Sequence, residues 1–445
     1  MNVIGLDIGT TSISAALFDT DSKEVKDTRT IAHKSFLPAK EGFERMQDPA
    51  IIMNIVLGAA DELIDSCPDV SAIGLTGQMH GILYVDADGQ AISPLFTWQD
   101  GRGNALGSDG KTLCQELKDR YQTNYYTGYG LITHIYNLRH GLVPEGAAKL
   151  CTIMDYLGMK LTGRCTPLMH SSDAASLGFY DIEAASFQTD ILEAEGVDIS
   201  ILPEISSSIE ILGSYRSIPV TVAIGDNQAS FIGSVEHAEE EVLVNMGTGG
   251  QVSVYSDIIV RGENIETRPL LEDSYIIVGS SLCGGRSYAM LADFFRSCAD
   301  WMGIGKIDIY SVMDKMLSSC PSSKNLKIDT AFSGTRDNPS RTGSITGITP
   351  DTFTPEALTR GMVEGMASEL YKRYSVMQQA ANAHHTCLLA SGNGFRKNKH
   401  LQESFSKTFG MQLTLSDLTE EAACGTAIAA STALGGKSWR QVLGL

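Results

Sequence analysis

Cysteine pairs and basic residues are both scarce in this 445-residue sequence, and each shortage excludes a class of protein. The nine cysteines include no C-x-x-C pair, which argues against a structural zinc site and against a disulfide framework. The 34 lysine and arginine residues are outnumbered by 53 aspartate and glutamate residues, giving a formal net charge of -19. An acidic chain of this kind disfavours nucleic acid and anionic membrane as partners, because both bind basic surfaces.

Long apolar runs and the common nucleotide fingerprints are missing as well. No apolar run reaches the roughly 18 residues that a membrane span needs. The amino terminus lacks the basic-then-apolar layout of a signal peptide, so we expect a cytoplasmic protein. Neither G-x-x-x-x-G-K-[ST] nor a G-x-G-x-x-G after a strand occurs in the sequence. A P-loop enzyme and a dinucleotide-binding domain are therefore not supported.

The length and the order of predicted elements indicate the fold class. Single hydrophobic cores stop growing at roughly 250–300 residues, so we expect two domains of similar size. Predicted strands alternate with helices, which is typical of an α/β protein. Asp48 and Pro49 form a helix start signal, and Thr354 and Pro355 repeat that signal before a second long helix.

Two glycine–threonine turns stand out because they lie at matching places in the two halves. Residues 3–19 read VIGLDIGTTSISAALFD, which predicts a β-hairpin whose turn is Gly9, Thr10 and Thr11. Residues 242–255 read VLVNMGTGGQVSVY and repeat this outline, with Gly247, Thr248 and Gly249 at the turn. A similar hairpin opening each half predicts two related domains.

The residues at these turns suit a phosphate group. Glycine permits strained dihedral angles and close approach of a phosphate, while N–H groups and hydroxyls donate to its oxygens without adding charge. Asp7, at the first turn, is a hard oxygen ligand that could hold Mg²⁺ beside those phosphates. The alternative is that Asp7 only caps the turn, and the second hairpin makes this the weaker interpretation.

An acidic residue follows a predicted buried strand in the stretch IPVTVAIGDNQASFIG, residues 218–233. Asp226 lies at the carboxyl end of that strand, where it could accept a proton from a substrate hydroxyl. An Asp-Asn pair after a strand is more often a helix cap, but its position just before the second hairpin favours a functional role.

Polar and aromatic residues follow two further predicted strands. The segments GLTGQMHG and LFTWQDGR combine side chains that bind hydroxyls with an aromatic face that suits the C–H face of a sugar. A single histidine here would more often be a core residue. The candidate residues of a polyhydroxylated ligand site are Gln78, Met79, His80, Trp98, Asp100 and Arg102.

Two glycine turns in the second half precede helices. Gly392 and Asn393, in the segment LASGNGFRKNKH, lie at a predicted helix start, where the helix amino terminus would favour a phosphate group. Asn398 in the same segment could reach the base or ribose of a nucleotide. SLCGGRSY enters another helix at Gly285, which could form a wall of the same nucleotide site.

From Gly5 to about Ala430, the sequence resembles the FGGY carbohydrate kinases. The motifs that carry this resemblance, in chain order, are GLDIGTTS, TGQMHG, TWQDGR, IGDNQAS, NMGTGG, GGRSYAML and SGNGFRKN. The resemblance implies an α/β fold of two ribonuclease-H-like domains, of the actin/hexokinase superfamily, flanking a central cleft. Residues 1–235 would carry the sugar site and the first phosphate hairpin. Residues 236–445 would carry the second phosphate hairpin and the adenosine pocket.

The resemblance also implies a role for each candidate residue. Asp226 would be the general base, and Asp7 would support Mg²⁺. The residues that would contact ATP are Gly9, Thr10, Thr11, Gly247, Thr248, Gly249, Gly285, Gly392, Asn393 and Asn398. The family often has Gly-Gly-Gly or Gly-Ser-Gly at the turn that here reads Ser391-Gly392-Asn393-Gly394, so the resemblance implies nucleotide binding there without fixing the individual contacts.

The expected activity is ATP-dependent phosphorylation of a ketose at a terminal primary hydroxyl. QMHG resembles the xylulokinase and sedoheptulokinase branches, and TWQDGR with YTGYG favours sedoheptulose as substrate. The alternatives are a xylulokinase or another FGGY sugar or polyol kinase, and more remotely a non-catalytic ATP-binding switch or sugar sensor. Ketose and ATP are the expected partners, and a homodimer is one alternative for the oligomeric state.

Overall fold

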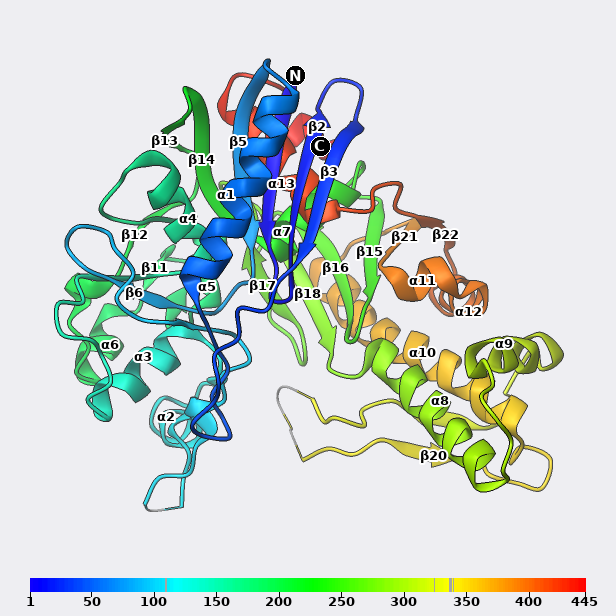
Figure 1. Ribbon diagram of the computed structural model, residues 1–445. Helices are drawn as coiled ribbons and strands as arrows, with labels where there is room; N and C mark the ends of the chain where they lie inside the picture. Colours follow the sequence, from blue (N-terminus) through cyan, green and yellow to red (C-terminus); the bar gives the residue numbers. More distant parts are fainter. Residues whose placement is uncertain (109, 324, 336–337, 339) are drawn as a thin grey trace. The chain divides into compact units, whose positions relative to one another are not determined.

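The computed structural model describes residues 1–108, 110–323, 325–335, 338 and 340–445 (Figure 1). The chain divides into two compact units. Unit 1 comprises Met1–Gly233, Arg268–Ser274 and Glu420–Leu445, and unit 2 comprises Ser234–Thr267 and Tyr275–Thr419. Each unit is built around a six-stranded sheet with packed helices, so the predicted α/β class with two domains is confirmed.

The sheet of unit 1 has the strand order β13-β14-β5-β1-β2-β3. Strand β1 pairs antiparallel with β2 and parallel with β5, and β5 pairs parallel with β14. The strands of this sheet are β1 (Asn2–Ile8), β2 (Ser12–Asp19), β3 (Glu24–Ala32), β5 (Val70–Gly77), β13 (Ile211–Tyr215) and β14 (Ile218–Gly225). The predicted hairpin of residues 3–19 is therefore present as β1 and β2.

The other elements of unit 1 are helices and short strands. The helices are α1 (Pro49–Ser66), α2 (Leu113–Tyr121), α3 (Gly130–Arg139), α4 (Ile153–Thr162), α5 (Ser171–Ser176), α6 (Thr189–Ala194), α7 (Asp226–Ser234), α13 (Glu421–Ala433) and α14 (Trp439–Val442), with 3-10 turns at Arg102–Asn104 and Ile199–Ile201. The short strands are β4 (Met46–Gln47), β6 (Leu83–Val85), β7 (Leu95–Phe96), β8 (Lys149–Cys151), β9 (Leu168–His170), β10 (Tyr180–Asp181), β11 (Ser186–Phe187) and β12 (Glu204–Ser206).

Unit 2 repeats the central strand topology of unit 1. Its sheet has the order β17-β18-β16-β15-β21-β22, in which β15 pairs antiparallel with β16 and parallel with β21. Strand β21 then pairs parallel with β22, as β5 does with β14 in unit 1. This shared topology agrees with the predicted relation between the two halves.

The elements of unit 2 are as follows. Its strands are β15 (Glu241–Met246), β16 (Gly250–Ser256), β17 (Glu266–Pro269), β18 (Tyr275–Ser281), β19 (Lys327–Asp329), β20 (Ser344–Thr346), β21 (Cys387–Ser391) and β22 (Gln412–Leu415), and the last two residues of β17 are assigned to unit 1. Its helices are α8 (Gly284–Trp301), α9 (Ile309–Ser319), α10 (Pro355–Ala381), α11 (Asn393–Lys397) and α12 (Lys399–Phe409). None of the helices in the described part of the chain combines the length and apolar character needed to cross a membrane.

Both predicted helix starts are confirmed, because local capping determines them. The side chain of Asp48 accepts a hydrogen bond from the backbone N–H of Ala50 at the start of α1. Thr354 accepts one from Ala357 at the start of α10. In each helix a proline occupies the first turn, where a missing N–H costs no helical hydrogen bond.

Helix α13 contacts the backbone of the unit 1 sheet directly because two strand residues are glycines. A Cβ added at Gly5 would lie 1.8 Å from the carbonyl oxygen of Ala423, and one at Gly74 would lie 2.3 Å from that of Thr426. The opposite face of this sheet packs on α1 and α4 with apolar side chains such as Ile4. Residues Glu420–Leu445, which the sequence analysis assigned to the second domain, therefore belong to unit 1.

We expect Gly5→Ala to lower the thermal unfolding midpoint of the protein markedly. The added methyl group can be accommodated only if α13 moves away from the sheet, which costs about 1–3 kcal/mol or more. Gly58→Ala is the matched control, since Gly58 lies in α1 with open space around it. There alanine should stabilise by about 0.5–1 kcal/mol through helix propensity. Unchanged thermal unfolding of Gly5→Ala would contradict the close contact.

Candidate active site

Asp7 is in one of the two strands that flank β5 in unit 1, and Asp226 directly follows the other. Asp7 is in β1, in register with Thr76 of β5. Asp226 is the first residue of α7 and directly follows Gly225, which is in register with Gly77 of β5. Both carboxyl groups are half-buried. The sheet thus brings together two acids that are more than 200 residues apart in sequence.

The surroundings of these acids raise both of their pKa values. Burial raises the pKa of Asp226 to about 6, and the positive charge of Arg268 opposes this rise. Burial raises the pKa of Asp7 to about 7, with further contributions from the negative charges of Asp226 and Glu420. At neutral pH Asp226 is thus mostly ionised and able to accept a proton.

The carboxylate of Asp7 and the negative charges around it are compatible with a bound Mg²⁺ ion. A cation bound beside Asp7 would compensate the repulsion from Asp226 and Glu420. Among the described residues no group of three or more His, Cys, Asp or Glu side chains is arranged to hold a metal ion. Mg²⁺ is commonly bound through one or two carboxylates, waters and substrate phosphates, so a full cage of protein ligands is not required.

Thr10 connects the first glycine–threonine turn to the candidate sugar residues. Its hydroxyl accepts a hydrogen bond from Nε1 of Trp98 (2.9 Å), and its carbonyl oxygen accepts one from Nε2 of Gln47 (2.7 Å). Nε2 of Gln78 donates in turn to Oε1 of Gln47 (2.9 Å). Trp98 nevertheless remains 47% exposed, so part of its surface is accessible to a ligand.

Sequence reasoning did not identify Gln47 or His33, which hold this turn from elsewhere in the chain. Nε2 of the His33 ring lies 3.1 Å from the carbonyl oxygen of Gly9, and the backbone N–H of His33 donates to the carbonyl oxygen of Thr11 (3.0 Å). Both residues lie outside the quoted motifs: His33 directly follows β3, which pairs with β2, and Gln47 is in β4, which pairs with β7. Only a periodic strand pattern could have placed them near the turn.

Met79 and His80 lie in the connection between β5 and β6, as the sequence predicted. Met79 is buried, and a Cβ at Gly225 would lie 2.7 Å from its methyl carbon, so Met79 packs next to the residue before Asp226. His80 has a positive φ of 72° and stacks on Tyr129 at a ring distance of 4.6 Å. Its Nδ1 lies 2.6 Å from the carbonyl oxygen of Ser176, which fixes the ring.

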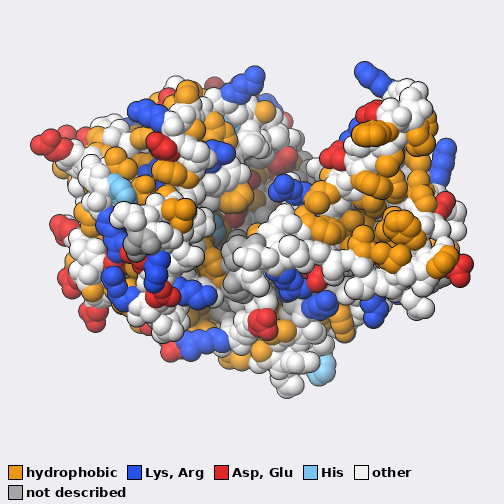
Figure 2. Space-filling view, turned by 90° about the horizontal axis from the view of Figure 1, so that it is seen from below, with side chains coloured by type: hydrophobic (Ala, Val, Ile, Leu, Met, Phe, Trp, Pro, Cys, Tyr) orange, Lys and Arg blue, Asp and Glu red, His pale blue; other side chains and the backbone are white. Residues whose placement is uncertain are grey.

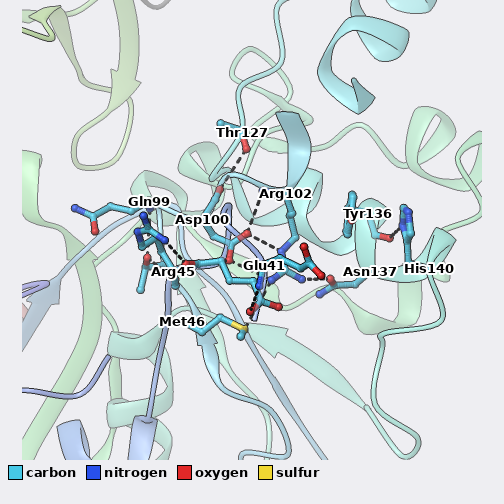
Figure 3. Close-up of polar contacts among 12 residues, drawn as sticks. Glu41, Arg45, Met46, Gln99, Asp100, Arg102, Thr127, Tyr136, Asn137 and His140 are labelled. Atoms are coloured by element: carbon cyan, nitrogen blue, oxygen red, sulfur yellow. Dashed lines mark hydrogen bonds and ion pairs between the residues drawn. The ribbon is translucent and has the colours of Figure 1, made fainter. Parts of the chain in front are cut away.

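Asp100 and Arg102 form a buried ion pair (Figure 3). Nε and Nη2 of Arg102 donate to the two carboxylate oxygens of Asp100 at 2.6 Å and 3.1 Å. The backbone N–H of Arg45 also donates to Asp100 (3.0 Å), and Arg102 donates to Asn137. These polar atoms are thus engaged within the protein, where they hold the loop that carries Trp98.

In unit 2 the second glycine–threonine turn packs on the start of α8. The N–H of Gly285 donates to the carbonyl oxygen of Gly247 (3.0 Å), and the N–H of Arg286 donates to that of Thr248 (3.1 Å). A Cβ at Gly284 would lie 2.3 Å from the carbonyl carbon of Gly249. Two N–H groups in the first turn of α8 are therefore used to hold the Gly247–Gly249 turn.

The remaining candidate nucleotide residues lie at the starts of α11 and α12. Gly392 has a φ of 90°, and a Cβ there would lie 2.8 Å from the carbonyl oxygen of Met246. Asn393 begins α11 directly afterwards. Asn398 caps α12 by accepting from the N–H of Leu401 (3.0 Å), and it hydrogen-bonds Tyr288 of α8. Unit 2 thus places Gly285 and Gly392 beside the Gly247–Gly249 turn or the strand that leads into it, while Asn398 contacts α8 through Tyr288.

Comparison with protein families gives a match over nearly the whole chain. Residues 2–233 match the N-terminal domain, and residues 244–434 the C-terminal domain, of the FGGY family of carbohydrate kinases. The chain is 27% identical to a sedoheptulokinase from Mus musculus, over 91% of this chain and 92% of that protein. It is 26% identical to a glycerol kinase from Saccharolobus islandicus, over 97% and 88% of the two chains.

A solved structure shows the same fold. The crystal structure of a xylulose kinase from Rhodospirillum rubrum matches with a TM-score of 0.85 at 20% sequence identity. The match covers 100% of this chain and 92% of that chain. At this identity the likeness establishes the fold alone.

Proposed function

Because this chain belongs to the FGGY family of carbohydrate kinases, we propose that it transfers the γ-phosphoryl group of ATP to a terminal primary hydroxyl of a ketose, with sedoheptulose as the substrate. The observation that carries this proposal is the position of Asp226. Asp226 directly follows β14, burial raises the pKa of its carboxyl group to about 6, and β5 separates β14 from the strand of a second acid, Asp7. A phosphoryl-transfer enzyme requires such a base, whereas a binding protein does not.

In the proposed reaction, Asp226 accepts the proton of the sugar hydroxyl as that oxygen attacks the γ-phosphorus. The O–H bond breaks, the new O–P bond forms, and ADP leaves with the bridging oxygen. Asp7 would hold Mg²⁺, which supplies neutralisation of phosphate charge when bound. The protein otherwise contributes positioning, which accounts for most of the catalysis in phosphoryl transfer.

We propose that both glycine–threonine turns contact the phosphates of ATP, through Gly9–Thr11 and Gly247–Gly249. Their N–H groups and hydroxyls would donate to phosphate oxygens. In unit 2, α8 holds the turn in place through Gly285, and the turn itself would contact phosphate. Gly285, Gly392, Asn393 and Asn398 would line the adenosine pocket.

We propose that the sugar binds beside Trp98. The exposed indole offers an apolar wall, and Gln78, Met79 and His80 approach from the end of β5. Asp100 and Arg102 would contribute to sugar binding mainly by holding the loop that carries Trp98 in position.

The substrate is best tested with a panel of acceptors. An ADP-release assay with sedoheptulose, xylulose, ribulose, fructose and glycerol should give the highest kcat/KM with sedoheptulose. The 27% identity to a sedoheptulokinase supports this choice. Xylulose is the second candidate, because QMHG resembles the xylulokinase branch as well. A clear preference for xylulose or glycerol would displace sedoheptulose, and ATP binding without turnover of any acceptor would instead support a non-catalytic switch.

We expect Arg268→Met to move the acidic limb of the pH–activity profile to higher pH. The positive charge of Arg268 lowers the pKa of Asp226, so its loss raises that pKa and protonates the base at higher pH. The measurement is kcat/KM from pH 5 to 8. Arg216→Met serves as the control, because Arg216 is exposed and pairs with Asp61 and Asp65 of α1. An unmoved acidic limb in Arg268→Met would refute the assignment of that limb to Asp226.

A further inference from the structure

The short helix α5 of unit 1 carries polar side chains that are buried. On the face drawn in Figure 2, acidic and basic side chains lie at the surface among apolar ones, which is where polar side chains are usually found. Ser171, Ser172 and Ser176 of α5, by contrast, are at most 3% exposed. Buried hydroxyls normally have hydrogen-bond partners, so the partners of these serines indicate what the helix does.

Ser172, near the start of α5, holds the residue that precedes the proposed base. Its Oγ accepts a hydrogen bond from the backbone N–H of Gly225 (3.0 Å), the last residue of β14. Asp226 follows directly as the first residue of α7. The direction in which the backbone leaves β14, and with it the position of the Asp226 carboxyl group, therefore depends on Ser172.

His170, at the end of β9, fixes the orientation of the Ser172 hydroxyl. Nε2 of His170 lies 3.2 Å from the carbonyl oxygen of Ser207, which can only accept, so Nε2 carries the ring proton. Burial lowers the pKa of His170 to about 4, so the ring is neutral at pH 7 and Nδ1 is an acceptor. The Ser172 hydroxyl, 2.9 Å from Nδ1, then donates to it, which leaves the lone pairs of Oγ for the N–H of Gly225.

Ser176, at the other end of α5, holds His80 of the proposed sugar site. Its Oγ accepts a hydrogen bond from the backbone N–H of His80 (3.0 Å), and its carbonyl oxygen accepts one from Nδ1 of the His80 ring (2.6 Å). The Ser176 hydroxyl itself donates to the carbonyl oxygen of Asp173 (2.7 Å). A positive φ is uncommon for a residue with a side chain, and these bonds hold His80 at its φ of 72°.

We propose that α5 is a positioning element of the kinase site. Its Ser172 aligns Asp226 with the acceptor hydroxyl. Its Ser176, four positions along the same helix, aligns His80 with the sugar. The inference rests on the proposed function, because it takes Asp226 as the base and His80 as a sugar contact. One short helix then sets the distance between the group that binds the acceptor and the group that accepts its proton, and both serines act only through the residues that they hold.

Ser172→Ala should lower kcat about 10- to 100-fold and leave the KM of the sugar nearly unchanged, because a small displacement of a catalytic group costs up to about 100-fold in rate. The rates are measured with the best acceptor of the panel and are divided by the number of ATP-binding sites counted by calorimetry, so that unfolded protein does not contribute. Ser171→Ala is the matched control. Ser171 is the neighbouring buried serine, its hydroxyl has no hydrogen-bond partner among the described residues, and its loss should leave kcat unchanged.

Ser176→Ala should have the complementary effect. The KM of the sugar should rise about 10-fold, because His80 is no longer held in its uncommon backbone conformation, while kcat and the KM of ATP should change much less. A variant that merely folds less well loses apparent kcat and keeps its KM. A raised KM of the sugar therefore identifies positioning, and an unchanged KM would contradict the role of Ser176.

A double variant separates positioning of the base from a general loss of structure. If Ser172 acts only through Asp226, adding Ser172→Ala to Asp226→Asn should not lower kcat further. A further drop of about 10-fold in the double variant, an unchanged kcat in Ser172→Ala, or an equal loss in Ser171→Ala would overturn the inference. Failure of the unmodified protein to turn over any acceptor is a different result, which would refute the proposed function and this inference with it.

Discussion

We expect Asp226→Asn to lower kcat for sugar phosphorylation by at least 100-fold. Asparagine has nearly the same shape as aspartate but cannot accept a proton, and a positioned general base contributes about 10²- to 10⁴-fold to the rate. The ADP-release assay with sedoheptulose measures this loss. ATP affinity, measured by calorimetry, should change little, because the proposed role of Asp226 concerns the acceptor hydroxyl.

The pH profile provides an internal check on this assignment. In the unmodified protein, activity should fall below about pH 6 as Asp226 becomes protonated. The residual activity of Asp226→Asn should lack this single-proton dependence. Asp65→Asn is the control, since Asp65 is an exposed acid of α1 that pairs with Arg216. Phosphorylation near the normal rate in Asp226→Asn would refute the base assignment.

We expect Asp7→Asn to have opposite effects on activity and on stability. Activity should fall by at least 100-fold, because the proposed Mg²⁺ ligand is lost. In metal-free buffer at pH 8, however, the free energy of unfolding should rise by on the order of 2–4 kcal/mol. The reason is that ionised Asp7 is disfavoured in the folded state by burial and by the charges of Asp226 and Glu420.

The sign and range of this effect follow from the raised pKa of Asp7. The pKa is about 7 in the folded protein and 3.8 in its ordinary state. The folded protein therefore holds this proton more tightly, and stability is lost as the pH rises from about 4 to about 7. The advantage of Asp7→Asn should be largest above pH 7 and absent below pH 4. An equal or lower stability of the variant at pH 8, measured by urea unfolding, would contradict the account.

A metal titration separates the two roles of Asp7. Mg²⁺ should stabilise the unmodified protein more than Asp7→Asn, because only the former has the carboxylate ligand. Glu420→Gln should show a smaller gain in metal-free stability, since Glu420 contributes less than burial and Asp226 do.

The parts of the fold that the sequence predicted are those determined by neighbouring residues. The Asp48 and Thr354 caps hydrogen-bond within three positions, and the glycine–threonine turns join consecutive strands. Asp226 was identifiable because the buried strand before it has a strong apolar pattern. In each of these cases the relevant interactions lie within a few residues of the motif.

The remaining features depend on contacts between distant segments. Arg268 lowers the pKa of Asp226, although the two residues are 42 positions apart in sequence. Glu420 raises the pKa of Asp7, although most of the chain separates them. No local pattern marks either residue. Asp100 and Arg102 were predicted as sugar ligands from their types, but that role stays a prediction, and only the structure reveals that they pair with each other.

The contact of Gly5 with Ala423 has a consequence for folding during synthesis. Helix α13 follows every strand of both sheets along the chain, so the ribosome releases the strands of unit 1 long before the helix that covers one face of their sheet. Unit 2, which ends at Thr419, can be completed earlier. The strands of unit 1 are thus translated first, but unit 1 completes its fold last. Before α13 packs, the glycine-lined face of the unit 1 sheet is accessible to chaperones and to misassembly.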